Sequence, residues 1–356
     1  MNKTLPIITT YSRCRHNPGD TFIGEGLRYV AELAAGCPLP WQILSKFRPE
    51  QWEEAIPDMA RSPITLYAGT PQYNNYSKWK FDYDDELWSR VINPNEIPVA
   101  VMAGGSGEPD PHVTPEEWAK ELCDDEATVR IINQRMQFAK LFTVRDRHSK
   151  ALLDRLGIES TLLPCTAIFA GDYAGIVHAP IKGRIAVVPN KHEEPEVSGW
   201  WLTLAQLLKD QGYDPVFVCH ERVEFDALQR TETTIPVYYT NDYYALLRFY
   251  GTCDGIISAR LHGALPAWGI GVTHALNLTL DSRGYAVEEC GIENAILNDS
   301  EPRDIADRFA EIVSTLGQRG DDRLRIRSAT AMSYAELLRP LLANWQQYGD
   351  ITTCLG

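Results

Sequence analysis

The 356-residue chain lacks long hydrophobic runs, and it also lacks an excess of positive charge. No apolar window reaches the length that crosses a membrane, and the first residues are too polar for a secretory signal peptide. We therefore expect a cytoplasmic protein, with contact to a membrane surface as a further option. The 34 Lys and Arg residues against 48 Asp and Glu residues give a formal net charge of −14. Because such a surface repels phosphate backbones, we expect no nucleic-acid partner, and an anionic ligand would need locally clustered arginines.

Several cofactor and metal motifs are also missing. The eight cysteines are scattered, with neither a C-x-x-C pair nor zinc-ligand spacing, which is typical of free thiols in a reducing compartment. No G-x-G-x-x-G loop followed by an acidic residue is present, and no glycine-rich loop ends in Gly-Lys-Ser or Gly-Lys-Thr. These absences argue against a dinucleotide enzyme and a P-loop ATPase. No H-E-x-x-H or paired-carboxylate motif is present, so we expect neither a metal nor a resident cofactor.

Short apolar runs alternate with amphipathic stretches along the chain, a pattern typical of parallel sheets covered by helices. We predict an α/β protein with two doubly wound, Rossmann-like domains, 1–177 and 178–320, and a C-terminal helix within 321–356. The domains would face each other across a cleft, where the carboxyl ends of parallel strands bind ligands. The predicted strands are 5–11, 64–68, 97–102, 141–144, 184–189, 214–219, 236–239, 253–258 and 271–277, and the candidate helix caps are Asp20, Ser198 and Asp242.

Two strand-to-helix junctions carry basic residues. In the segment 253–272, an apolar strand runs directly into a helix whose first turn holds Arg260, Leu261 and His262. The unpaired N–H groups of a helix start, together with a guanidinium and an imidazole, suit a compact dianion. R-x-H alone is a weak pattern, and an ion-paired Arg beside a core His is the simpler alternative. Arg145 stands at the equivalent junction of the first domain. There we expect Asp146 to cap a helix or to pair with an arginine, and Ser149 to be a surface or capping residue.

Three glycine-containing segments of the first domain also follow or end predicted strands. They contain Asn17-Pro18-Gly19-Asp20, Ala68-Gly69-Thr70-Pro71 and Ala103-Gly104-Gly105-Ser106-Gly107. Glycine lets backbone N–H groups approach a ligand closely. As candidate donor or acceptor contacts we therefore name Asn17, Gly19, Asp20, Gly69, Thr70, Gly104, Gly105 and Ser106, with Asn277 at a strand end of the second domain.

The order of these motifs resembles the polysaccharide pyruvyl transferase family over roughly residues 5–300. The shared elements are N-x-G-D, a Gly-rich turn, a strand ending in Gly-x-Gly, V-R-D-x-x-S, S-x-R-L-H-G, and the segment 280–285. The resemblance implies a glycosyltransferase-B-like arrangement, phosphoenolpyruvate as donor, and a pyruvate ketal on a saccharide or lipid-linked saccharide of a cell-surface polysaccharide. It implies donor binding by Arg260, Leu261 and His262, with His262 and Arg260 catalytic and Arg145 a second basic anchor.

The chain departs from the family pattern at one informative position. Where the family often has Asp-Pro-Ala, this chain has Leu163-Pro164-Cys165-Thr166-Ala167. A thiol can add to phosphoenolpyruvate, so Cys165 is a candidate nucleophile, although a buried cysteine is more often an inert small hydrophobic residue. The imidazole of His262 suits a proton donor, a base or a phosphate ligand because its ordinary pKa is near neutrality.

Other interpretations remain open at this stage. A nucleotide-sugar glycosyltransferase of the same architecture would use Glu288 or Glu289 on a ribose, and pyruvyl transfer to a non-sugar acceptor or a non-catalytic family relative are further alternatives. Aromatic side chains could stack on an acceptor sugar, although aromatic residues in such patterns more often belong to the hydrophobic core. The candidates are Trp200, Trp201, Tyr238, Tyr239, Tyr243, Tyr244 and the loop Tyr73-Asn74-Asn75-Tyr76.

Overall fold

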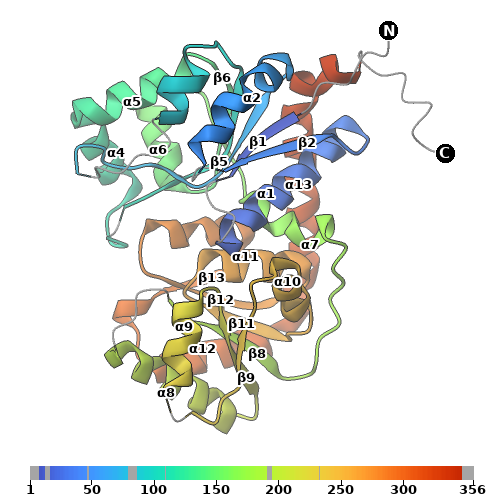
Figure 1. Ribbon diagram of the computed structural model, residues 1–356. Helices are drawn as coiled ribbons and strands as arrows, with labels where there is room; N and C mark the ends of the chain where they lie inside the picture. Colours follow the sequence, from blue (N-terminus) through green and yellow to red (C-terminus); the bar gives the residue numbers. More distant parts are fainter. Residues whose placement is uncertain are drawn as a thin grey trace, which may run out of the picture.

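The computed structural model describes residues 8–12, 17–45, 48–78, 86–108, 110–190, 195–231 and 233–346. Two separate sheets, each with helices on its faces, account for most of these residues (Figure 1). Every recorded strand pair in both sheets is parallel. The predicted α/β class is therefore confirmed. None of the described helices has the length and apolarity that a membrane crossing requires.

The first sheet has the order β2-β1-β3-β5-β6-β7, with β4 paired to β5. Both faces of its central strands are covered. In β5, Val99 and Val101 pack into one hydrophobic cluster, and Ala100 and Met102 pack into another on the opposite face. This two-sided burial explains why the central strands are continuous apolar runs. Its strands are β1 (Ile8–Ser12), β2 (Trp41–Ser45), β3 (Thr65–Ala68), β4 (Pro71–Tyr73), β5 (Val99–Ser106), β6 (Ala139–Val144) and β7 (Thr161–Leu162).

The second sheet has the order β10-β9-β8-β11-β12-β13. Crossover helices connect its parallel strands, as a doubly wound sheet requires. Its strands are β8 (Arg184–Val188), β9 (Asp214–Cys219), β10 (Val237–Tyr239), β11 (Gly255–Ser258), β12 (His274–Thr279) and β13 (Glu293–Ile296). The helices around it are α8 (Pro195–Asp210), α9 (Arg222–Gln229), α10 (Tyr243–Gly251), α11 (Leu261–Ile270) and α12 (Pro302–Ser314).

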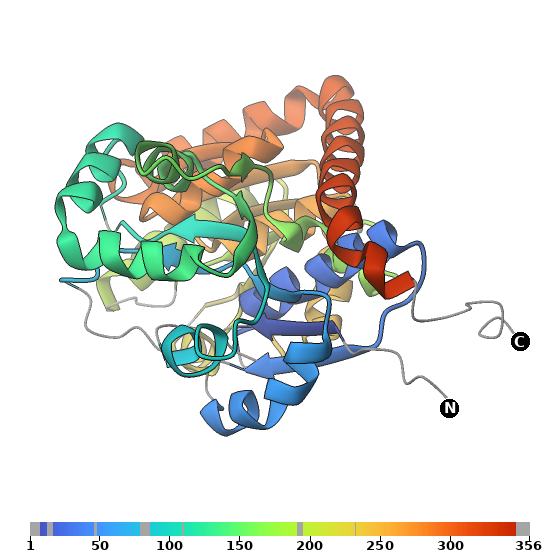
Figure 2. The ribbon, with the colours of Figure 1, turned by 90° about the horizontal axis from the view of Figure 1, so that it is seen from above.

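The two halves share one hydrophobic cluster. It includes residues of α1 (Pro18–Ala35), of the turns η2 (Thr166–Phe169) and α7 (Ala170–Tyr173), and of α11 in the second half. Helix α13 (Leu316–Gln346) starts in the second half and returns to lie beside α1 (Figure 1, Figure 2). There Tyr334 is fully buried and donates to the Pro164 carbonyl at 2.9 Å. This shared packing holds the carboxyl edges of the two sheets in a defined relation.

Several local predictions need correction. Asn17, not Asp20, caps α1: its Oδ1 accepts from the Gly19 N–H at 3.0 Å, and Asp20 lies in the first turn. Helix α8 begins at Pro195, so Ser198 lies inside it. Asp242 caps α10 as predicted. The sequence analysis also did not identify β2, β13, α12, α2 (Pro49–Arg61) or α4 (Pro115–Asp124). The first three residues of the predicted strand 5–11, residues 5–7, lie outside the described residues.

Candidate functional site

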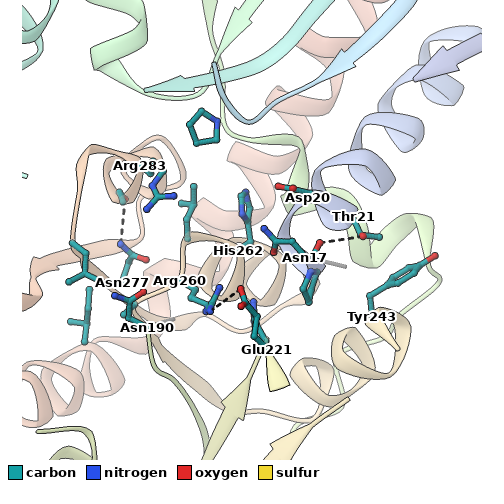
Figure 3. Close-up of a pocket in the computed structure, with 18 of the residues that line it drawn as sticks. Asn17, Asp20, Thr21, Asn190, Glu221, Tyr243, Arg260, His262, Asn277 and Arg283 are labelled. Atoms are coloured by element: carbon teal, nitrogen blue, oxygen red, sulfur yellow. Dashed lines mark hydrogen bonds and ion pairs between the residues drawn. The ribbon is translucent and has the colours of Figure 1, made fainter. Parts of the chain in front are cut away.

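A cavity of about 1060 Å³ opens between the two sheets. Its wall is built from the carboxyl ends of strands in both halves, with residues that follow β3, β6, β8, β9, β10, β11 and β12. The starts of α1 and α11 complete it (Figure 3). Of the residues named from the sequence, the wall contains Asn17, Asp20, Arg145, Arg260, Leu261, His262, Asn277, Tyr239 and Tyr243.

Arg145 is a buried guanidinium in this wall. The residue has no exposed surface, and its Nε and Nη1 atoms have no hydrogen-bond partner among the described residues. No carboxylate of the described residues forms an ion pair with it. Asp146, the next residue, instead caps α6 (Arg147–Arg155), accepting from Ser149 N at 2.8 Å and from Ser106 N at 2.9 Å. A buried and unpaired positive charge is costly, so its presence beside a cavity indicates an anionic ligand.

The end of β5 is shaped around Arg145. The strand bulges at Ala103, whose φ of 54° is in the left-handed region, and the register with β6 shifts there. The predicted turn at 103–107 is therefore mostly strand. A Cβ on Gly105 would lie 2.4 Å from the Arg145 Nε atom. Gly105 thus makes room for the guanidinium, a role that its position in the sequence did not reveal.

His262 lies in the first turn of α11, between the two halves. A Cβ on Gly19 would lie 2.6 Å from its Nδ1 atom, and its Nε2 atom lies 3.9 Å from the Cys165 sulfur. Burial lowers the pKa of His262 well below its usual range, and the positive charge of Arg145 lowers it further. The imidazole is therefore neutral at pH 7 in the free protein. Figure 3 shows Asn17 and Asp20 on one side of His262, with Asn277 and Arg283 on the other.

Cys165 lies behind His262 and is not part of the cavity wall. Burial raises the pKa of its thiol, and the neighbouring Arg145 only partly opposes this. A fully buried neutral thiol is a poor nucleophile. The geometry therefore favours the interpretation of Cys165 as a packing residue beneath His262.

Arg260 is the residue directly before the first residue of α11, and its guanidinium is paired with two carboxylates of the second half. Its Nη2 atom forms an ion pair with Glu224 and lies 3.5 Å from the Glu221 Oε1 atom. The second oxygen of the buried Glu224 carboxylate accepts from the backbone N–H groups of His220 at 2.7 Å and Glu221 at 2.9 Å. Glu224 therefore ties Arg260 to the start of α9.

Replacing Glu224 by Ala is expected to lower the free energy of unfolding by about 3–5 kcal/mol, because it leaves a mostly buried guanidinium and two backbone donors short of partners. Glu224→Gln keeps an acceptor for the backbone and should cost less. Asp226→Ala, which removes an exposed partner of Arg222, should change the free energy by no more than about 0.5 kcal/mol. Urea denaturation measures all three. Equal stabilities of the Glu224→Ala and Asp226→Ala variants would show that the buried pair does not form.

The other candidate contacts named in the segments 68–71 and 103–107 lie outside the cavity wall and have packing contacts instead. A Cβ on Gly69 would meet the Ala103 carbonyl, and one on Gly104 would meet the Tyr73 ring. Thr70 is buried. Ser106 bonds through its hydroxyl to that of Ser282 at 2.8 Å, which links the two halves. Gly69, Thr70, Gly104, Gly105 and Ser106 thus support the wall rather than form its surface.

The acceptor hypotheses are narrowed by the geometry. The loop 73–76 lies away from the cavity wall: Asn75 donates to Glu121 at 3.2 Å and Tyr76 receives a bond from Arg135 at 2.8 Å. That acceptor hypothesis is wrong. Of the six other aromatic candidates for acceptor stacking, only Tyr239 and Tyr243 line the wall. The four outside it are Trp200, Trp201, Tyr238 and Tyr244. Glu288 and Glu289 are not in the wall either, and Glu289 pairs with Arg147 at 3.1 Å, so neither is placed to bind a ribose there.

The wall residues that the sequence did not reveal include His220, Glu221 and Arg222. They directly follow β9, just as Arg145 follows β6 and Arg260 follows β11. The same rule, polar residues at the carboxyl end of an apolar strand, would have found them. The pairing of Glu224 with Arg260 had no such signal, because it joins side chains 36 residues apart.

The fold is similar to solved structures across nearly its whole length. UDP-N-acetylglucosamine 2-epimerase from Rickettsia bellii is 9% identical with a TM-score of 0.56, covering 99% of this chain and 100% of that one. UDP-GlcNAc 2-epimerase from Neisseria meningitidis, bound to UDP-GlcNAc, is 10% identical with a TM-score of 0.53, covering 95% and 99%. The alpha,alpha-trehalose 6-phosphate synthase from Burkholderia multivorans is 9% identical with a TM-score of 0.50, covering 97% and 99%. These likenesses show the fold alone: two Rossmann-like units in a glycosyltransferase-B-like arrangement.

A search of curated protein sequences finds no match. The sequence pattern of a family, polysaccharide pyruvyl transferase, does match, over residues 57–272. This match covers more than half of the chain and includes the Arg145 and Arg260–His262 segments. The chain therefore belongs to the polysaccharide pyruvyl transferase family, as its motif order suggested.

Proposed function

We propose that this protein transfers the pyruvyl group of phosphoenolpyruvate to two hydroxyl groups of a saccharide, forming a pyruvate ketal. One observation carries the proposal. Arg145, a buried guanidinium without a counter-charge among the described residues, shares a cavity wall with Arg260 and His262 from the other half of the molecule. In a protein of net charge −14, a buried guanidinium without a counter-charge among the described residues favours a small, strongly anionic ligand.

The charges of this wall suit a donor with two anionic groups. Phosphoenolpyruvate carries a phosphate and a carboxylate on a three-carbon frame. Arg145 and Arg260 can divide these groups, and the free N–H groups at the start of α11 add a partial positive charge. Because Arg145 has no exposed surface in the free protein, donor binding requires side chains of the wall to move. In this reaction phosphoenolpyruvate is a co-substrate, and no step uses a metal or a resident cofactor.

The chemistry requires proton transfers at carbon and at oxygen. A proton is added to the methylene carbon while the first acceptor hydroxyl attacks the neighbouring carbon and loses its own proton. The C–O bond to phosphate then breaks, and the second hydroxyl closes the ketal and loses its proton. Of the two protons released by the hydroxyls, one replaces the proton given to carbon and one leaves with phosphate. We assign the transfer to carbon to His262, whose ring lies beside both arginines.

The acceptor has room in the same cavity. Its volume of about 1060 Å³ is at the upper end of the range of about 300–1,000 Å³ for small-molecule sites. Tyr239, Asn241 and Tyr243 line the part next to α10 and offer hydroxyl, amide and ring surfaces that suit a neutral sugar. The proposal places the reaction in the cytoplasm, with the protein at the membrane surface when the saccharide is lipid-linked.

The test is release of inorganic phosphate from phosphoenolpyruvate in the presence of galactosides, mannosides and N-acetylated hexosamines, free and lipid-linked. We expect phosphate release that depends on one of these acceptors, with a new methyl signal of the ketal in the NMR spectrum of the product. Release of a nucleoside diphosphate from a nucleotide sugar, without phosphate release from phosphoenolpyruvate, would support the glycosyltransferase alternative and contradict the proposal.

A further inference from the structure

A second imidazole lies in the cavity wall. His220 follows β9 directly and is buried, with only 3% of its surface exposed. Its strand is joined to that of Arg260 through β8, so both residues stand at the same edge of the sheet. His220 and His262 are close enough for the charge of one to lower the pKa of the other. The mechanism described above gives His220 no role.

The two nitrogens of the His220 ring have different surroundings. Nε2 lies 2.6 Å from the hydroxyl of Tyr250, a fully buried residue near the end of α10. Nδ1 has no hydrogen-bond partner among the described residues, yet it is not among the fully enclosed unpaired atoms. Since the residue lines the cavity, Nδ1 is the nitrogen left to face a ligand.

The Tyr250 hydroxyl can support either form of the imidazole. Burial raises the pKa of Tyr250 well above its usual range, so the phenol keeps its proton. Its oxygen can accept from an Nε2–H group, and its O–H can donate to an unprotonated Nε2. A neutral ring can therefore present its Nδ1 lone pair to the cavity, and it can hold a proton on Nδ1 afterwards without losing the contact to Tyr250.

The charged neighbours of His220 place it beside Arg260. Glu224 accepts from its backbone N–H and pairs with Arg260. The positive charge of Arg260 adds to the effect of burial in lowering the pKa of His220, so the ring is neutral at pH 7 in the free protein. A neutral imidazole beside an arginine that binds the donor is suited to taking up a proton and passing it to the departing phosphate.

We propose that His220 is a second acid–base residue of the transfer and that Tyr250 is its positioning residue. This inference rests on the proposed function. Nδ1 of His220 takes the proton of the first acceptor hydroxyl while the new C–O bond forms and the C=C π bond breaks. His262, which has gained a proton on donor binding, gives that proton to the methylene carbon. When the C–O bond to phosphate breaks, His220 returns its proton to the leaving phosphate. The second hydroxyl closes the ketal and gives its proton to His262, which restores both rings.

The experiment compares the rate of phosphate release in a single turnover with the affinity for phosphoenolpyruvate measured by calorimetry. His220→Gln should release phosphate about 100-fold more slowly or worse, while the dissociation constant of phosphoenolpyruvate stays within about twofold. Tyr250→Phe, which keeps the ring and removes the hydroxyl, should slow release about tenfold with unchanged affinity. His274→Gln is the matched control: it removes a buried histidine bonded to the Asp254 carbonyl at the amino end of β12, and both values should equal those of the wild type.

The outcomes are distinct. A wild-type release rate in a folded His220→Gln variant would overturn the inference and leave the proposed function intact. So would a loss confined to donor affinity, which would make His220 a phosphate ligand only. If His220→Gln does not fold, a wild-type rate in Tyr250→Phe overturns the inference. Absence of phosphate release by the wild-type protein across the whole acceptor panel would instead refute the proposed function.

Discussion

Replacement of Arg145 by Met is expected to remove measurable phosphoenolpyruvate binding without destabilising the free protein. Charge-assisted hydrogen bonds contribute about 1.5–3 kcal/mol each, so loss of one guanidinium should raise the dissociation constant by about 100-fold or more. The free energy of unfolding should stay the same or rise by up to about 4 kcal/mol, because Met fills the space of a buried charge for which the described residues supply no counter-charge. Calorimetry and urea denaturation measure the two effects.

The Arg145→Met experiment is informative because donor affinity is expected to fall while the stability of the free protein stays the same or rises. Arg147→Met, two residues further along the chain, removes a guanidinium whose side chain is 66% exposed and paired with Glu289, and it should leave donor affinity unchanged. If Arg145→Met destabilises the protein by several kcal/mol and still binds phosphoenolpyruvate, Arg145 is a structural cation and the donor lies elsewhere.

Replacement of His262 by Gln is expected to reduce phosphate release about 1,000-fold, within the range of about 10²–10⁴ for loss of an acid–base residue. The free ring is neutral at pH 7, because burial and Arg145 lower its pKa. The negative charge of bound phosphoenolpyruvate offsets the positive charge of Arg145 and stabilises the protonated ring. Phosphoenolpyruvate binding should therefore be accompanied by proton uptake in the wild type and by less uptake in His262→Gln. Calorimetry in buffers of different ionisation enthalpy counts these protons.

The same lowered pKa predicts how stability depends on pH. As the pH falls below about 6.5, the usual pKa of histidine, the unfolded chain takes up protons that His262 and His220 cannot take up in the folded state. These two residues therefore favour unfolding at low pH, and phosphoenolpyruvate should reduce the effect.

A wild-type turnover rate in His262→Gln, or no proton uptake on donor binding, would contradict the role of His262 at carbon.

Much of the fold could be predicted because parallel strands buried on both faces are continuous apolar runs. The strands around Leu66, Val101 and Ile256 were placed within a few residues on that basis. Strand β2 was missed because it is an edge strand with a partly exposed pattern. The extent of β5 was underestimated because its glycines indicated a turn, whereas they serve close contacts with Tyr73 and Arg145.

The candidate site was only partly predictable, for a related reason. Arg145 and Arg260 could be placed at one cavity because both follow apolar strands at the carboxyl edge. In the described part of the chain, Arg260 is ion-paired with Glu224 and Arg145 has no ion pair. This difference depends on side chains that only the folded chain brings together. The two arginines could therefore be predicted from the sequence, but the difference in their pairing, which carries the proposed function, could not.

The central claim is that basic residues of both halves hold one donor molecule, and a crystal structure with phosphoenolpyruvate bound tests it most directly. We expect one anionic group of the donor within about 2.7–2.9 Å of the Arg145 guanidinium and the other at the start of α11, beside Arg260 and His262. Phosphoenolpyruvate bound on the second half alone, with Arg145 still buried and out of contact, would contradict the account.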